Sequence, residues 1–146
     1  KGALNRGALR QIILQDAAAK HDLEALTHPA IRERIGQWFQ QQAILKQEFA
    51  VVEAALLIET GSHSDYDLLL VVTCPPEVQL SRLLARSPIS EAEARGWIEH
   101  QLPLRDKERM ADFVVQNHGD QQDLQVQVTS LIPRLREATV RGPASQ

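Results

Sequence analysis

The chain has 146 residues, of which 43% are hydrophobic and 24% charged, a balance typical of a globular domain and not of a disordered segment. Its formal net charge of −3 lacks the basic excess that general nucleic-acid binding requires, so we expect no nucleic-acid partner. The single cysteine, Cys74, excludes an internal disulfide and a site of several thiolates, and we expect its thiol to be buried. No apolar run approaches the roughly 20 residues of a membrane span, and no signal peptide is visible. We therefore expect no membrane partner and a cytoplasmic location.

The first part of the chain is expected to be helical. Asn5 is a plausible N-cap for a first helix, whose apolar residues recur at helical spacing. A second, short helix is expected to end near Thr27, where Thr27 or His28 can cap a new helix with Pro29 in its first position. That new helix is long and mostly apolar on one face. Taken alone, Arg6 is typical of a solvated surface and His28 of a capping or packing residue.

A nearly continuous apolar segment follows at residues 49–58, interrupted only by Glu53. Such continuity favours a strand covered on both faces, as in a parallel sheet. Glu59 would then stand at the carboxyl end of that strand, where open parallel sheets bind ligands, although a plain surface carboxylate fits the pattern equally well.

Two further strands are expected at residues 67–73 and 113–116, with helices between and after them. A turn at residues 117–120 precedes the last amphipathic helix, which Pro133 should kink or end. Strands that alternate with helices predict an α/β fold with a mainly parallel sheet.

Two arginines lie one helical turn apart, one on the helix expected at residues 77–85 and one directly after it. Arg82 and Arg86 are i,i+4 neighbours, and two like charges at this spacing cost a few tenths of a kcal/mol. An anion between them would reverse the sign, because the arginine fork donates bidentately to phosphate. Without such an anion the pair is an ordinary solvated face. A capping box at Ser90 begins the next helix, which Pro103 should stop.

Several familiar catalytic motifs are absent from these 146 residues, among them His-Glu-x-x-His, Cys-x-x-Cys, Gly-x-Ser-x-Gly and Gly-x-Gly-x-x-Gly. Gly2 and Gly7 have the Gly-x4-Gly spacing of a phosphate-binding P-loop. However, Ala8 and Leu9 follow where Lys and Ser or Thr are required. No residue is a convincing base for activating a hydroxyl, so we expect no catalytic residue and no metal ligand in this chain.

Taken in order, short segments along nearly the whole chain resemble those of the dephospho-coenzyme A kinase family. They are Leu4-Asn5-Arg6-Gly7-Ala8-Leu9-Arg10, Leu26-Thr27-His28-Pro29-Ala30-Ile31, Ala55-Leu56-Leu57-Ile58-Glu59, the run from Pro75 through Gln79 and Arg82 to Arg86, Gln101-Leu102-Pro103, Lys107, Ala111-Asp112 and Asn117-His118-Gly119. Ala55 and Ser87 depart from the family pattern, which has a proline and an acidic residue there.

The resemblance implies a P-loop kinase that transfers the γ-phosphate of ATP to the ribose 3′-hydroxyl of dephospho-CoA, the last step of coenzyme A biosynthesis. It implies ATP and Mg²⁺ as cofactors and dephospho-CoA as the small-molecule partner, with catalysis by positioning and charge neutralisation. The residues it implies are Arg82 and Arg86 in a lid over the ATP phosphates, Asn117 near the adenine, and Arg6, His28 and Glu59 toward the acceptor.

The fold implied by the resemblance is a P-loop kinase-like three-layer α/β/α architecture with a parallel sheet and a helical lid. Its N-terminal strand, P-loop and catalytic base would precede Lys1, so we expect the chain alone to be inactive. The division implied is a helical acceptor (CoA)-side region at 1–48, an α/β core at 49–75 and 111–140, lid helices at 76–110, and a disordered tail at 141–146.

The strand order implied by the resemblance pairs residues 68–73 with 113–116 in parallel. A strand-wide gap near 10 Å, two spacings of roughly 4.8 Å, should separate 68–73 from 49–58. Two alternatives stay open: another P-loop nucleotide or nucleoside kinase, and a non-catalytic α/β module derived from one. Nothing in the sequence indicates the oligomeric state.

Overall fold

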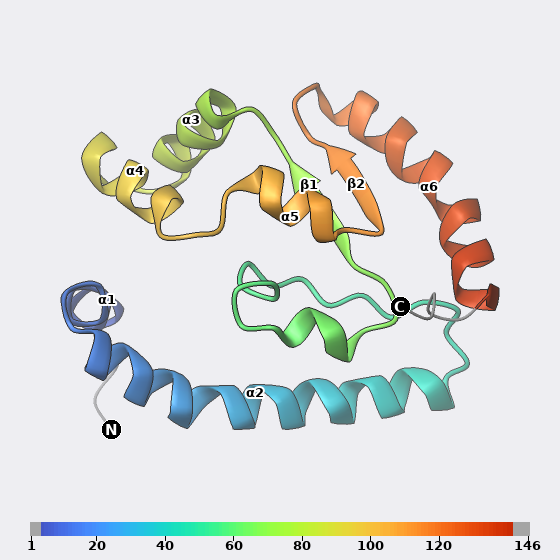
Figure 1. Cartoon of the computed structure of the whole chain (residues 1–146), viewed down its shortest axis with the longest axis horizontal. Coiled ribbons are helices and arrows are strands. Elements are labelled where there is room, and N and C mark those ends of the chain that lie inside the picture. Colours follow the sequence, from blue (N-terminus) through green and yellow to red (C-terminus); the bar gives the residue numbers. More distant parts are fainter. Residues whose placement is uncertain (1–3, 142–146) are drawn as a thin grey trace. The chain divides into compact units, whose positions relative to one another are not determined.

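A computed structural model describes residues 4–141 of the chain (Figure 1). The chain divides into two compact units, Lys1–Glu53 and Ala54–Gln146, and each is described by itself. The elements in chain order are α1 (Arg6–Gln15), α2 (Ala17–Ile44), the 3-10 helix η1 (Ser62–Asp65), β1 (Leu70–Thr73), α3 (Pro76–Arg86), α4 (Glu91–Glu99), α5 (Leu104–Met110), β2 (Phe113–Gln116) and α6 (Gln121–Arg141). The tail expected at residues 141–146 lies outside the described residues, apart from Arg141 at the end of α6.

The first unit consists of two helices with well-formed N-termini. The Asn5 side chain accepts the Ala8 N–H at 3.1 Å, so the expected cap of α1 is confirmed. Asp16 caps α2 in the same way. No described residue of α2 is buried, and Ile31 and Trp38 remain exposed on the face that the sequence marks as apolar.

The break expected around Thr27 to Pro29 is wrong, because α2 runs through these residues without interruption. Thr27 does not cap a helix; its hydroxyl donates to the Leu23 carbonyl at 2.8 Å, a bond made inside a helix. Pro29 deprives only one carbonyl of its N–H donor. Ending and restarting the helix would leave up to four unpaired carbonyls and four unpaired N–H groups, so continuity costs less. His28 consequently lies within α2 and is half-exposed.

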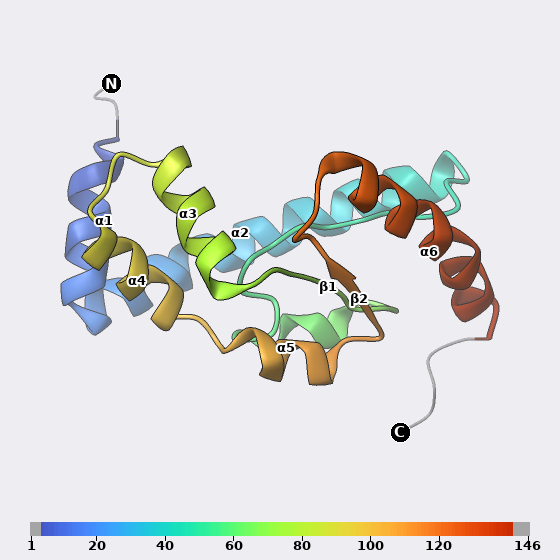
Figure 2. The same ribbon diagram turned by 90° about the horizontal axis from the view of Figure 1, so that it is seen from above.

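The second unit contains a two-stranded parallel sheet. The register pairs Leu70 with Phe113 and continues to Thr73 with Gln116, which confirms the expected pairing of these two strands. In Figures 1 and 2, α5 lies beside β1 and α6 beside β2, in agreement with their contacts. Within the described residues β1 has no neighbour on its other edge, and Val72 keeps 54% of its surface exposed.

The apolar residues buried in this unit are few. They are Ile58, Val71, Leu83, Ala94, Val115 and Leu131. Cys74 follows β1 and is only partly buried, so the expected burial of its thiol is wrong; the strand ends one residue earlier, and the chain turns there toward α3.

The strand expected at residues 49–58 is also wrong. The structure has irregular chain from residue 49 to Ala54 and turns from Ala55 to Gly61, with Gly61 in the left-handed region at φ 71°. Apolar character alone does not make a strand, because a strand needs a neighbour to complete its hydrogen-bond ladder. No described strand lies beside this segment, so it turns instead, and the expected gap between two strands has no counterpart here.

The helices that follow β1 are mostly those expected. Ser90 forms the predicted capping box with Glu93, while α4 ends at Glu99 before Gln101. Pro103 then begins α5, a helix for which the residue pattern gave no expectation. Pro133 lies inside α6, which continues to Arg141 and so does not end there.

Candidate functional site

The carboxyl ends of β1 and β2 lie at the same end of the sheet, and open α/β sheets bind ligands at that end. Asn117 directly follows β2, and its backbone N–H donates to the Thr73 carbonyl at 2.7 Å. Arg82 extends from α3 to this end of the sheet, and its Nη1 donates to the Asn117 carbonyl at 2.7 Å. The fold therefore brings together two of the residues that the sequence singles out, far apart in the chain.

Arg86 lies one turn beyond Arg82 in the last turn of α3. Its side chain is exposed, and it makes no hydrogen bond or ion pair among the described residues. A cation at a helix C-terminus is favoured by the helix dipole, which is a structural reason for an arginine here. Arg82 uses only Nη1 to bond Asn117, so both guanidinium groups have further N–H donors that could bind an anion.

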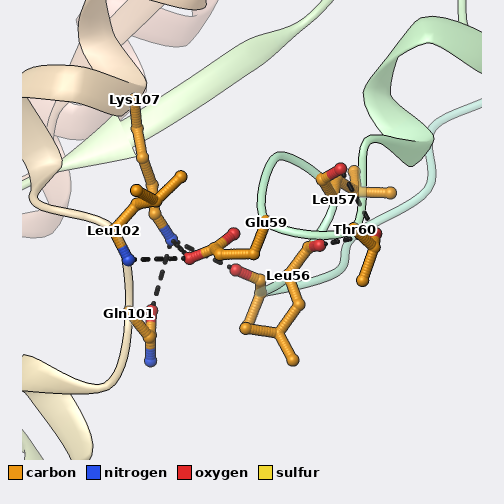
Figure 3. Close-up of polar contacts among 8 residues, drawn as sticks. Leu56, Leu57, Glu59, Thr60, Gln101, Leu102 and Lys107 are labelled. Carbon is orange, nitrogen blue, oxygen red and sulfur yellow. Dashed lines mark hydrogen bonds and ion pairs between the residues drawn. The ribbon is translucent and has the colours of Figure 1, made fainter. Parts of the chain in front are cut away.

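A second cluster surrounds Glu59, which lies in the turn before η1 (Figure 3). Lys107, from α5, places its Nζ 2.6 Å from Glu59 Oε1, and its side chain is only 9% exposed against 17% for Glu59. The same Nζ donates to the carbonyl of Ala55 at 3.3 Å and to Gln101 Oε1 at 3.4 Å. The Leu102 N–H also donates to Glu59 Oε1, at 3.1 Å. The cluster thus ties an irregular segment to the α4–α5 connection.

The charge state of Glu59 follows from these contacts. Burial by itself raises the pKa of its carboxyl, but the hydrogen bond from Lys107 opposes that effect. Backbone N–H groups, including that of Leu102, and the charge of Lys107 also lower the pKa. The resulting pKa of Glu59 lies below the usual value of 4.5. Glu59 is therefore ionised at neutral pH. Its second oxygen, Oε2, is buried without a hydrogen-bond partner in the described part of the chain.

Lys107 belongs to the segments that resemble the family but is not one of the site residues expected from the sequence. The signal that would have found it is its helical spacing, since Lys107 follows Leu104 by three residues and precedes Ala111 by four. A lysine on the inward face of a helix needs an anionic partner, and Glu59 supplies it.

Arg6 and His28 belong to the first unit. Arg6 is exposed in the first turn of α1, and His28 is half-exposed in the middle of α2. Within that unit neither side chain makes a hydrogen bond or ion pair with a described residue, and their expected role remains a prediction.

A pocket of about 390 Å³ lies at the opposite end of the sheet, beside the residues that precede the two strands. Its lining residues are His63, Tyr66, Leu69, Arg109, Met110 and Asp112. Among the described residues there is no group of three or more His, Cys, Asp or Glu side chains that would hold a metal ion. None of the helices there is long and apolar enough to cross a membrane.

The model of one protein family, described as "CoaE: Dephospho-CoA kinase", matches residues 1–123. The chain belongs to the dephospho-CoA kinase family. It is 39% identical over 142 residues to the dephospho-CoA kinase of Syntrophotalea carbinolica, a match that covers 97% of this chain and 67% of the relative. The dephospho-CoA kinase of Aromatoleum aromaticum is 37% identical, with 91% of this chain and 64% of the relative covered.

Solved structures agree with this assignment. The crystal structure of TT1252 from Thermus thermophilus matches with a TM-score of 0.71 at 29% identity, over 92% of this chain and 69% of that chain. The dephospho-CoA kinase from Campylobacter jejuni matches with a TM-score of 0.64 at 26% identity, over 95% of this chain and 69% of that chain. The resemblance drawn from the sequence and the α/β class with a parallel sheet are confirmed. The chain spans about two thirds of the length of the relatives it matches.

Proposed function

We propose that this chain, joined to the remaining third found in its relatives, phosphorylates the ribose 3′-hydroxyl of dephospho-CoA with ATP. This would be the last step of coenzyme A biosynthesis, and we propose a cytoplasmic location with it. The observation that carries the proposal is the hydrogen bond from Arg82 to the Asn117 carbonyl at the carboxyl end of a parallel sheet. Arg86 is exposed one helical turn away. Family membership supports the same reading.

On the ATP side, Arg82 and Arg86 would donate to the phosphates, because guanidinium forks match phosphate oxygens and neutralise their charge. The Asn117 side chain, which makes no hydrogen bond with the described residues, would be free to contact the adenine. The lid would comprise residues 76–110, hence α3, α4 and α5. Mg²⁺ would enter with ATP as the MgATP substrate and offset the charge of its phosphates.

On the acceptor side, Arg6, His28 and Glu59 would face dephospho-CoA, with residues 1–48 forming most of that region. Arg6 and His28 have unused polar groups within their own unit. Glu59 would contribute an ionised carboxylate to this region, with its Oε1 held by Lys107 and the Leu102 N–H.

The core at residues 49–75 and 111–140 would be completed by a strand outside this chain. The open edge of β1 and the exposure of Val72 support such an addition, because unpaired strand edges expose donors and acceptors to pairing. In this proposal the P-loop and the catalytic base come from the same added part, since none of the 146 residues forms a Gly-x4-Gly-Lys-Ser/Thr motif.

The test is a chimera of this chain with the part of the Syntrophotalea carbinolica relative that it does not cover. The purified chimera should form ADP when given ATP and dephospho-CoA, and should not when given adenosine or a nucleoside monophosphate. The intact relative serves as the positive control. A folded chimera without turnover, beside an active relative, would support the non-catalytic module. Turnover with a nucleoside or a nucleoside monophosphate instead of dephospho-CoA would support the other kinase class.

A further inference from the structure

The outer edge of β2 is closed at its last residue by a side chain of α6. Gln127 Oε1 accepts the backbone N–H of Gln116 at 3.0 Å, and Gln127 Nε2 donates to the backbone carbonyl of the same residue at 2.9 Å. In a strand, the N–H and C=O of one residue point to the same edge, and those of the next residue point to the opposite edge. The amide of Gln127 therefore takes the place of a neighbouring strand at Gln116.

The next residue is held from two other directions. The Asn117 N–H points back to β1 and donates to Thr73, while the Asn117 carbonyl accepts the bond from Arg82. Two consecutive residues are thus fixed by three elements: α6 through Gln127, β1 through Thr73, and α3 through Arg82. None of these bonds uses the side chain of Asn117, which is left to contact a ligand.

The geometry points to Gln127 as a positioning residue of the nucleotide site, an inference that rests on the function proposed above. By holding both backbone groups of Gln116, Gln127 fixes the orientation of the peptide that follows. That peptide carries the Asn117 N–H, which Thr73 also holds, so its orientation places the Cα atom from which the Asn117 carbonyl extends to the Arg82 guanidinium. Loss of the Gln127 bonds should therefore disturb the ATP side of the site and leave the acceptor side unchanged.

A purely structural role for Gln127 makes a different prediction. An amide that only blocks an open strand edge would contribute to stability and solubility. Its loss would then lower the apparent kcat, through the fraction of folded protein, and leave the KM values for both substrates unchanged. The comparison of the two KM values separates these roles.

The decisive variants are Gln127→Met, which keeps the length of the side chain and removes both bonds, and Gln127→Glu, which keeps the acceptor only. Gln125→Met is the matched control, because Gln125 is an exposed glutamine of the same helix and makes no side-chain hydrogen bond with the described residues. In the active chimera, Gln127→Met should raise the KM for ATP about three- to tenfold, with the KM for dephospho-CoA within twofold of wild type, on the scale of losing one or two hydrogen bonds. Gln127→Glu should lie between Gln127→Met and wild type, and the control should match wild type.

A double-variant cycle tests the route through Arg82. In an Arg82→Ala background, Gln127→Met should have little further effect on the KM for ATP, since the group that it positions is gone. Fully additive effects, an unchanged KM for ATP, or a KM that rises equally for both substrates would overturn the inference.

If the wild-type chimera shows no turnover, the proposed function fails, and amide hydrogen exchange in the chain itself still decides the positioning claim. Gln127→Met should then speed exchange at Gln116 and Asn117 at least tenfold relative to Val115, which lies in the core of β2. Unchanged protection at both amides would overturn it.

Discussion

Replacing Lys107 by methionine should destabilise the second unit substantially. The substitution keeps most of the side-chain volume but removes the charge 2.6 Å from Glu59, in a place where the Lys107 side chain is 9% exposed and that of Glu59 17%. Breaking a fully buried ion pair on one side costs about 3–5 kcal/mol, because the remaining charge stays desolvated. Since Glu59 keeps some solvent contact and the Leu102 N–H, we expect a loss of about 2–3 kcal/mol in the free energy of unfolding.

The assay is urea unfolding at neutral pH, read by tryptophan fluorescence. The chain has two tryptophans, Trp38 in the first unit and Trp97 in the second, so a Trp38→Phe background makes Trp97 report the second unit. The matched control is Arg109→Met, in the same helix of the second unit, which removes a cation from an exposed pair, 3.2 Å from Asp106, and should cost at most about 0.5 kcal/mol. The double variant Glu59→Leu/Lys107→Met should recover most of the loss, because no buried charge is then left alone.

The pH dependence follows from the lowered pKa of Glu59 in the folded state. A group whose folded pKa lies below its unfolded value stabilises the fold at high pH, and this contribution is lost as the pH falls through the folded pKa. The difference between wild type and Lys107→Met should therefore be greatest well above pH 4.5 and shrink on acidification below it. A Lys107→Met variant as stable as wild type, or no more destabilised than Arg109→Met, would refute the reasoning.

Three further predictions concern the lid and the chain as a whole. Arg86→Ala in the active chimera should lower kcat/KM about tenfold to a thousandfold, the scale of losing a charge-assisted phosphate contact. The control Arg105→Ala, at an exposed arginine on α5, should have little effect. Equal kinetics for Arg86→Ala and wild type would mean that Arg86 is an ordinary solvated surface residue. The chain alone should show no measurable kinase turnover in a coupled assay, and turnover that is lost with Arg82→Ala would contradict this. Ser90→Ala should cost about 1 kcal/mol of stability in urea unfolding, because it removes the hydroxyl that accepts the Glu93 N–H; a change near zero would mean that the cap adds nothing to α4.

The features that the sequence predicts correctly depend on few residues or on a strong pattern. A cap such as Asn5 or Ser90 involves groups three residues apart, so the local sequence decides it. The pairing of β1 with β2 came from the family resemblance, which supplies a strand order that periodicity does not contain.

The features that the sequence misses depend on partners far away in the chain. Residues 49–58 have the composition of a strand, yet strand formation requires a neighbouring strand that the described chain does not provide. The burial of Lys107 is understandable only with Glu59 in view, and the Gln127 amide only with the outer edge of β2. Pro29 was overestimated as a helix breaker, because the flanking residues on both sides favour the helix.

The free edge of β1 also sets a limit on how this chain can be handled. Residues 68–72 are Leu, Leu, Leu, Val and Val, a run without proline or charge whose β-propensity is high, and Val72 is largely exposed. Two copies of the chain can pair such edges with each other, and pairing between molecules accelerates with the square of concentration while folding does not. Dilute refolding should therefore yield monomer, and concentrated refolding should yield aggregates that bind amyloid dyes. A charged substitution such as Val72→Lys should suppress those aggregates without help from any other part of the protein.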